Sequence, residues 1–182
     1  MSGRRFPQDG LAGLTGLERM DEMREESRMA KEYRTLMTEI RLPYELSYGP
    51  VWTRFFEGMA EKKLYGTKCG KCGRILVPAR SFCPRCFVDT TEWVEVAQQG
   101  TLTAWSYVNY RYFGMPTEPP FIGALIRLDG TDVDFLHLMG GIDLDDFEQV
   151  RKTVKNGMKL KAVWKDERQG HILDLKYFEP LS

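Results

Sequence analysis

Four cysteines are the residues of this chain whose type and spacing point most directly to chemistry. They form two Cys-x-x-Cys pairs, Cys69 with Cys72 and Cys83 with Cys86, and ten residues separate the pairs. Each pair can turn tightly enough to direct both sulfurs at one ion, and two pairs complete a tetrahedral shell of four thiolates. Because such a shell leaves no coordination position for water, the sequence predicts a structural zinc site, a zinc ribbon, rather than a catalytic one.

Disulfides or a redox dithiol are the alternatives to zinc. The chain opens with polar residues rather than a secretory signal, which favours a reducing cytoplasm. All four cysteines lie within 18 of 182 residues, an unusual disulfide framework for a chain of this length. Two equivalent pairs are also unusual for a thioredoxin-like motif. Structural zinc is therefore favoured over both alternatives.

The composition is that of a globular protein with a core. Hydrophobic residues make up 42% of the chain and aromatic residues 12%, while 26 basic and 26 acidic residues cancel. No apolar run approaches the length needed to cross a bilayer. These features argue against a membrane or a nucleic acid as partner.

One segment departs from this charge balance, because residues 62–85 contain seven basic residues and no acidic one. The basic residues are Lys62, Lys63, Lys68, Lys71, Arg74, Arg80 and Arg85. They could bind an anionic ligand, or they could offset the formal charge of about minus two on a zinc tetrathiolate. The sequence leaves both explanations open.

Three regions are expected: a helical extension over 1–48, a helix with the zinc ribbon over 49–92, and a β domain over 93–182. Thr15 and Glu18 have the spacing of a helix capping box. Apolar residues then recur at helical intervals up to Pro43, and this stripe could pack on its own protein or dock on a partner. A second helix is expected after Pro50, and its aromatic residues need burial against the next domain or another subunit. The predicted partner-interface residues are Met20, Met23, Tyr33, Met37, Trp52, Phe55 and Phe56.

The last region has the pattern of β-strands interrupted by one helix. Strands are expected over 101–110, 121–128, 133–139, 158–164 and 172–178, and Asp143 is expected to cap a helix that ends near Gly157. Three strands, a helix and two strands are the order of a five-stranded OB-fold barrel, in which Gly100 would let the long first strand bend. A small β-sandwich is the alternative.

The chain resembles a family of small proteins in which a rubredoxin-like zinc ribbon precedes an OB fold and which are associated with thiolases and acyl-CoA. The resemblance covers about residues 50–180. It depends on the helix before Cys69-Gly70-Lys71-Cys72-Gly73, on Pro78-Ala79-Arg80 before the second cysteine pair, on Gly100 after Trp93, on Pro119-Pro120-Phe121 leading into residues 125–130, and on the ending at residues 174–180. Phe121, where the family often has tyrosine, and the long preface over 1–45 depart from the pattern.

The resemblance implies a mainly β, non-catalytic subunit that sits on a thiolase-fold enzyme and helps to form its acyl-CoA channel. Its cofactors would be structural Zn²⁺ and, as a ligand in the complex, coenzyme A or acyl-CoA. The candidate partner enzymes are benzoylsuccinyl-CoA thiolase, a lipid-transfer-type aldolase and a hydroxymethylglutaryl-CoA-forming enzyme. Coenzyme A needs cations for its phosphates and an apolar slot for its pantetheine arm. The candidate CoA-binding residues are Lys68, Lys71, Arg74, Arg80, Arg85, Tyr110, Tyr112 and Phe113.

Two other functions remain open at this stage. His137 and His171 are the only histidines, and no nucleotide-binding or hydrolase motif is present, so the sequence offers no catalytic set of its own. A zinc-ribbon OB protein could instead bind single-stranded nucleic acid, stacking bases on Trp105, Tyr107, Tyr110 and Tyr112, although the absent positive charge argues against this. A scaffold that touches no substrate is the third possibility.

Overall fold

The computed structural model describes residues 42–112, 115 and 117–181, and it divides the chain into two units, Met1–Glu45 and Leu46–Ser182. The second unit contains all the elements described below. The predicted N-terminal helix, with the interface residues Met20, Met23, Tyr33 and Met37, lies outside the described residues. None of the described helices is long and apolar enough to span a bilayer.

Helix α2 (Gly49–Ala60) leads into the ribbon, as expected from Pro50, which stands in its first turn. Phe55 and Phe56 are only 2% and 7% exposed and belong to the main hydrophobic core of the chain. The prediction that these two side chains contact a partner is therefore wrong, because the chain itself covers them. Trp52, one turn before Phe56 with its ring 5.6 Å from that of Phe56, is 48% exposed and stays a candidate interface residue.

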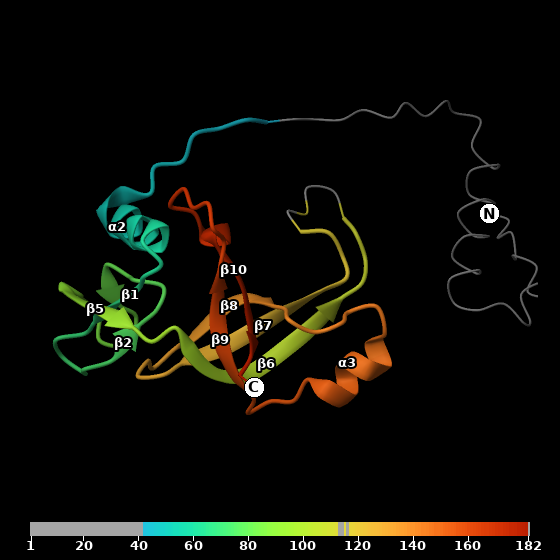
Figure 1. The fold of residues 1–182 in the computed structure, drawn as a ribbon. Helices are drawn as coiled ribbons and strands as arrows, with labels where there is room; N and C mark the ends of the chain where they lie inside the picture. The colour runs from blue at the N-terminus through green and yellow to red at the C-terminus, as the bar shows by residue number, and fades with distance from the viewer. Residues whose placement is uncertain (1–41, 113–114, 116, 182) are drawn as a thin grey trace, which may run out of the picture. The chain divides into compact units, whose positions relative to one another are not determined.

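The ribbon consists of two small antiparallel sheets (Figure 1). In the first, β1 (Leu64–Lys68) lies between β2 (Ile75–Leu76) and β5 (Glu92–Val96). The second pairs β3 (Phe82–Cys83) with β4 (Val88–Asp89). Because β5 pairs with β1 along its whole length, the sheet of the ribbon continues four residues beyond the boundary expected at 92/93.

Five further strands close into a barrel in the order β10, β8, β7, β6, β9 (Figure 1). These strands are β6 (Gln99–Val108), β7 (Phe121–Leu128), β8 (Asp134–Met139), β9 (Lys159–Trp164) and β10 (Leu175–Pro180). All pairings are antiparallel except that of β10 with β8. The predicted five-stranded OB-type barrel is confirmed, and the sandwich alternative is excluded because the sheet closes on itself.

Helix α3 (Phe147–Thr153) stands between β8 and β9, as the OB order requires. Its Val150 and the following Val154 are buried in the barrel core. The expected cap at Asp143 is wrong: Asp146 caps the helix, with its Oδ1 accepting from the N–H of Glu148 at 2.9 Å. Asp143 instead accepts from Asp145 in the preceding turn, because the extended backbone needed at an N-cap falls at Asp146.

Gly100 marks the point where three barrel strands approach most closely, since it pairs with Leu128 on β7 and Leu160 on β9. A Cβ at this position would lie 2.3 Å from the carbonyl oxygen of Arg127. We expect Gly100→Ala to lower the free energy of unfolding by about 1–3 kcal/mol, because the backbone of β7 would have to move. Urea denaturation would measure this change.

The matched control for that substitution is Gly123→Ala on β7, where a Cβ would meet no atom within 4 Å. We expect the control to leave stability unchanged or slightly raised, since alanine restricts the unfolded chain more than glycine does. Equal losses in the two variants would contradict a steric role for Gly100.

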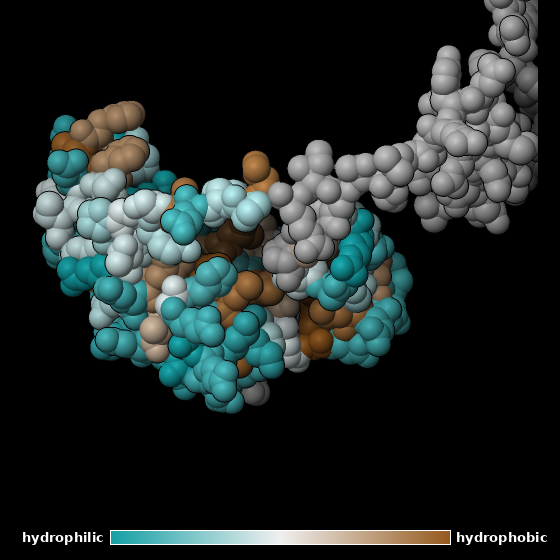
Figure 2. All heavy atoms as spheres, turned by 90° about the horizontal axis from the view of Figure 1, so that it is seen from above, coloured by the Kyte–Doolittle hydropathy of each residue, from teal (hydrophilic) through white to brown (hydrophobic). Residues whose placement is uncertain are grey.

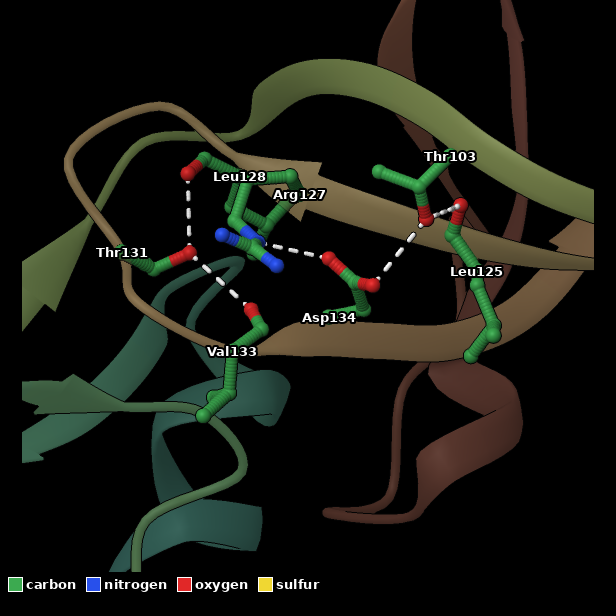
Figure 3. A network of polar contacts seen from close by, with 7 residues as sticks. All are labelled: Thr103, Leu125, Arg127, Leu128, Thr131, Val133 and Asp134. Atoms are coloured by element: carbon green, nitrogen blue, oxygen red, sulfur yellow. Dashed lines mark hydrogen bonds and ion pairs between the residues drawn. The ribbon is translucent and has the colours of Figure 1, made fainter. Parts of the chain in front are cut away.

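On the outside of the barrel, Asp134 joins three strands in a polar network (Figure 3). Its carboxylate accepts from Arg127 Nε at 2.6 Å and from Thr103 Oγ1 at 3.1 Å, and Thr103 also donates to the carbonyl of Leu125. Beside it, Thr131 Oγ1 donates to the carbonyl of Leu128 across the β7–β8 turn. The network holds the register of β6, β7 and β8 at the end of the sheet nearest the ribbon.

The β7–β8 turn also fastens the barrel to the ribbon. Asp132 accepts from the backbone N–H of Ile75 through its Oδ2 at 2.9 Å and donates its own N–H to the carbonyl of Ile75 at 3.0 Å. The backbone N–H and the carbonyl of Ile75, which face away from β1, therefore both have hydrogen-bond partners. This reciprocal pair adds to the apolar contacts between ribbon and barrel, since Leu64, Val77 and Ala79 belong to the same buried core as the barrel residues.

A second junction joins the β9–β10 loop to helix α2. Arg168 Nε donates to the carbonyl of Ala60 at the end of the helix, and the ring of His171 stacks on Phe56 with 6.4 Å between centroids. Asp174, which is buried, organises this loop: its Oδ2 accepts from the N–H groups of Gln169, Gly170 and His171 at 2.7 to 3.0 Å. Helix, ribbon and barrel are therefore tied together at two separate places.

Candidate metal centre and the surfaces around it

The four cysteine sulfurs converge on one point between the two turns of the ribbon. All four lie within 4.8 Å of one another, and Cys72 Sγ and Cys83 Sγ are 3.8 Å apart. A zinc ion with sulfurs at about 2.3 Å places them about 3.8 Å apart at tetrahedral angles. The cysteines form no disulfide, so this geometry fits a tetrathiolate zinc site and supports neither the disulfide nor the redox alternative.

Two turns of the same design present these sulfurs. The N–H of Gly73 donates to the carbonyl of Cys69, and the N–H of Phe87 donates to the carbonyl of Cys83, each at 2.9 Å. In both turns the residue after the second cysteine has a left-handed backbone, with φ of 73° at Gly73 and 52° at Phe87. Glycine adopts this conformation freely, whereas phenylalanine does so at a cost of about 1–3 kcal/mol.

Burial and hydrogen bonding give the thiols different acidities. The backbone N–H of Cys72 holds the pKa of Cys69 down at about 6. A hydrogen bond with Cys72 raises the pKa of Cys86 to about 12. Cys86 would therefore keep its proton at neutral pH until a divalent cation displaced it on binding. With four sulfur ligands, zinc would fold the ribbon and do no chemistry on a substrate.

The basic residues of the ribbon separate into paired and unpaired groups. Lys63 contacts Glu61 at 2.8 Å and Lys68 contacts Glu92 at 3.0 Å. Within the described part of the chain, none of the remaining ribbon cations forms an ion pair: Lys62, Lys71, Arg74, Arg80 and Arg85. Arg80 and Arg85 are exposed, so both can meet an anionic group from outside.

The predicted CoA site does not come together as one site within this chain. Tyr110 and Tyr112 are 63% and 55% exposed, and they follow the C-terminal end of β6. The ribbon lies at the other end of this strand, which would span about 30 Å if it were straight (Figure 1). Phe113 lies outside the described residues. The cations and the tyrosines could contact one CoA molecule only if a partner bridged them.

The aromatic residues proposed as stacking platforms for nucleic acid are mostly used by the fold. Trp105 packs partly buried against the barrel core, and Tyr107 donates its hydroxyl to the carbonyl of Leu144 while its ring lies 5.0 Å from that of Phe147. Both side chains lie opposite inward-facing residues of β7. Only the two loop tyrosines remain free to stack on a base.

Both histidines have structural roles. His171 caps the short 3₁₀ helix η1 (Ile172–Asp174), accepting from the N–H of Leu173. His137 is buried beside Phe135 and Phe178, and its Nε2 lies 3.1 Å from the carbonyl oxygen of Ile172. Because a carbonyl only accepts, Nε2 carries the proton, and Nδ1 is left without a hydrogen-bond partner.

Desolvation lowers the pKa of His137 from its ordinary value of 6.5. Between pH 6.5 and the lower pKa of the folded state, His137 is protonated in the unfolded chain and neutral in the folded chain. The free energy of unfolding therefore falls as the pH falls through this range. The slope approaches about 1.4 kcal/mol per pH unit for one proton. We expect His137→Gln, which keeps an amide donor for Ile172, to remove this part of the acid sensitivity between pH 6.5 and 5. Urea midpoints across pH would show it, and parallel curves for the two proteins would contradict it.

Sequence reasoning missed two residues that shape this region. Asp174 lies in the strand expected over 172–178 and in the ending that carries the resemblance, and no local pattern indicates that its carboxylate accepts from three N–H groups. Phe87 could have been found, because it occupies in the second cysteine turn the place that Gly73 occupies in the first. It is 83% exposed, the most exposed of the large hydrophobic residues described.

Two known domain families match adjacent parts of the chain. Residues 56–92 match the ChsH2 rubredoxin-like zinc ribbon domain, and residues 93–165 match the ChsH2 C-terminal OB-fold domain. None of the curated proteins searched is significantly similar in sequence.

Solved structures give the same architecture. A protein of unknown function from the DUF35 family of Sulfolobus solfataricus is 27% identical, with a TM-score of 0.53, covering 91% of this chain and 98% of the other. A chain of the Ltp2-ChsH2(DUF35) aldolase is 21% identical, also with a TM-score of 0.53, covering 70% of this chain and 91% of the other. The converging cysteines, the closed barrel and these matches together show that the chain carries a ChsH2-type rubredoxin-like zinc ribbon domain followed by a ChsH2-type OB-fold domain.

Proposed function

We propose that this chain is a non-catalytic, zinc-binding subunit of an acyl-CoA-processing complex, and that a thiolase-fold partner supplies the chemistry. The observation that carries the proposal is the pairing of a ChsH2-type zinc ribbon with a ChsH2-type OB domain on one chain. The likeness to a chain of the Ltp2-ChsH2(DUF35) aldolase supports the fold of such a subunit. The structural roles of His137 and His171 also support a subunit that leaves catalysis to its partner.

The finer assignment follows the sequence resemblance. We propose a thiolase of the benzoylsuccinyl-CoA type as the partner, in the cytoplasm, where four unbridged thiols would persist. The ribbon cations Arg80 and Arg85 would contact phosphates of coenzyme A in a site that the partner completes. Tyr110 and Tyr112, at the far end of β6, would then face the partner or another part of the ligand.

Co-expression of a tagged copy with the thiolase-like gene nearest to its own gene tests the proposal. Size-exclusion chromatography at moderate and high salt should give one peak that carries zinc and CoA-dependent cleavage activity. An interface of apolar anchors should survive high salt, whereas binding to nucleic acid should weaken steeply. A lone zinc-bearing protein with no partner would contradict the proposal, and salt-sensitive binding of single-stranded DNA would replace it.

A channel role and a scaffold role are separated by substitution of the ribbon cations. In the intact complex, Arg80→Gln with Arg85→Gln should weaken the binding of coenzyme A about tenfold or more, measured by calorimetry, since charge-assisted contacts to phosphate are lost. Arg151→Gln, an exposed arginine on α3, is the matched control. Unchanged affinity in the double variant, with the complex intact, would leave only a scaffold role.

A further inference from the structure

The two cysteine turns of the ribbon provide an internal comparison. They share the spacing of the cysteines, the N–H to carbonyl bond of 2.9 Å that closes the turn, and the left-handed residue that follows. Gly73 suits that conformation in the first turn, whereas Phe87 is held in it against its backbone preference in the second. The requirements of the turn alone would therefore favour glycine at position 87.

Packing within its own chain offers Phe87 little to offset this unfavourable backbone conformation. Its side chain is 83% exposed, and Phe82, in the same β3–β4 hairpin, is 47% exposed. Figure 2 shows hydrophobic atoms projecting at the outer edge of the ribbon side of the molecule. A strained backbone that carries an exposed aromatic ring is typical of a residue retained for an interaction with another molecule.

The cations of this region indicate which protein the ring meets. Arg85 lies in the same hairpin turn as Phe87, and Arg80 precedes the hairpin; both are exposed, and no ion pair between described residues involves either. The proposed function assigns both arginines to coenzyme A in a site that the partner completes, so a ring in the same hairpin would face that partner. A projecting ring cannot enclose a small molecule, because small-molecule sites are concave. It can fill a pocket on another protein, and aromatic side chains buried in such pockets are typical anchors of protein interfaces.

We propose that Phe87 anchors the zinc ribbon in an apolar pocket on the catalytic subunit of the complex. The inference rests on the proposed function, since it takes that subunit as the occupant. It adds the residue through which the ribbon binds and the chemistry of the surface that receives it. The left-handed turn aims the ring outward from the metal site, and zinc holds the turn rigid before the partner arrives.

The test compares three variants of the full chain in the zinc-loaded state. Phe87→Gly removes both the ring and the strain, Phe87→Tyr keeps both, and Phe147→Ala removes an exposed aromatic ring from α3 on the barrel as a control. For the chain alone, we expect the melting temperature of Phe87→Gly to rise by about 2 °C and not to fall. For the complex with the co-expressed thiolase-like subunit, we expect its affinity to weaken tenfold or more, measured by calorimetry.

The other variants fix the interpretation. Phe87→Tyr and Phe147→Ala should bind the catalytic subunit within about threefold of the wild-type chain. If Phe87→Gly binds as tightly as the wild-type chain, the inference is wrong while the proposed function stands. If Phe87→Gly melts at a lower temperature, the ring serves the fold and the inference is also wrong. If the wild-type chain forms no complex with that subunit, the inference and the proposed function fail together.

Discussion

Replacement of Cys83 by serine is expected to abolish zinc binding and to unfold residues 69–90 while the barrel stays folded. Cys83 is fully buried, and with Cys69 and Leu76 it forms a hydrophobic cluster separate from the main core. That cluster is too small to hold the two cysteine turns without metal, because structural zinc supplies on the order of 10 kcal/mol of binding free energy to such modules. The main core takes Val77 and Ala79 from this segment, but its other buried residues lie in α2, β1, β5 and the region from Leu102 onward, so the barrel should stay folded.

Limited proteolysis would measure this effect directly. Trypsin cleaves after lysine and arginine, and Lys71, Arg74, Arg80 and Arg85 all lie in the segment expected to unfold. The wild-type protein with zinc should resist cleavage there, and a chelator should reproduce the pattern of the Cys83→Ser variant. Circular dichroism should still report the β-structure of the barrel in both cases.

Ser81→Ala is the matched control, because Ser81 is exposed in the same hairpin and only its backbone carbonyl is used, by the N–H of Thr90. This variant should bind one zinc ion per chain and resist trypsin as the wild-type chain does. A Cys83→Ser protein that kept stoichiometric zinc and full protease resistance would contradict the tetrathiolate site.

Replacement of Asp174 by alanine is expected to destabilise the fold strongly, although the residue lies outside the metal site. Three backbone N–H groups, those of Gln169, Gly170 and His171, lose their common acceptor in a buried place. Each unsatisfied buried donor costs about 1–3 kcal/mol, and the losses overlap because the loop can partly open to water. We expect the free energy of unfolding to fall by about 3 kcal/mol or more.

Urea denaturation of the zinc-loaded protein would measure the loss. Asp174→Asn should be intermediate, because all three bonds end on one oxygen, Oδ2, and an amide can keep one oxygen in that place without the charge. Asp166→Ala, in the same loop, is the control, since Asp166 is exposed and only its carbonyl is used, by Arg168. Equal stability of the Asp174→Ala and Asp166→Ala variants would show that the carboxylate does not organise the loop.

The loss of the Asp174 carboxylate should also affect the helix that leads into the ribbon. The loop that it shapes carries Arg168, which donates to the carbonyl of Ala60, and His171, which stacks on Phe56. With the loop released, α2 would keep its place only through its apolar face. Any partner that contacts both the ribbon and the barrel should therefore bind the Asp174→Ala variant more weakly, even with zinc in place.

Much of the architecture was predictable because it depends on local patterns. Cysteine spacing sets the metal site, since two tight turns suffice to bring four sulfurs together. Alternation of apolar residues over 121–128 and 134–139 sets which side of β7 and β8 faces the core, because neighbouring side chains of a strand point to opposite faces. The order of three strands, a helix and two strands is compatible with few topologies other than the OB barrel.

Three predictions exceeded what local patterns can support. The apolar face of α2 predicts partner contacts for Phe55 and Phe56, but such a face does not reveal which surface covers it, and here it is the chain's own core. The residue chemistry of coenzyme A recognition groups the basic ribbon residues with the loop tyrosines, yet β6 separates them. The sequence predicts a helix cap at Asp143, although the backbone geometry at Asp146 decides it.

The sequence by itself determined the metal ligands, the closed barrel and the absence of a recognisable catalytic motif, because spacing, periodicity and residue chemistry are properties of neighbours along the chain. Only the tertiary structure decided that Asp132 and Asp174 tie the ribbon and its helix to the barrel, since these bonds join residues far apart in sequence or depend on the path of a loop. It alone revealed that Phe87 stands exposed in a left-handed turn, because backbone conformation and exposure arise only once the turn has closed around its cysteines.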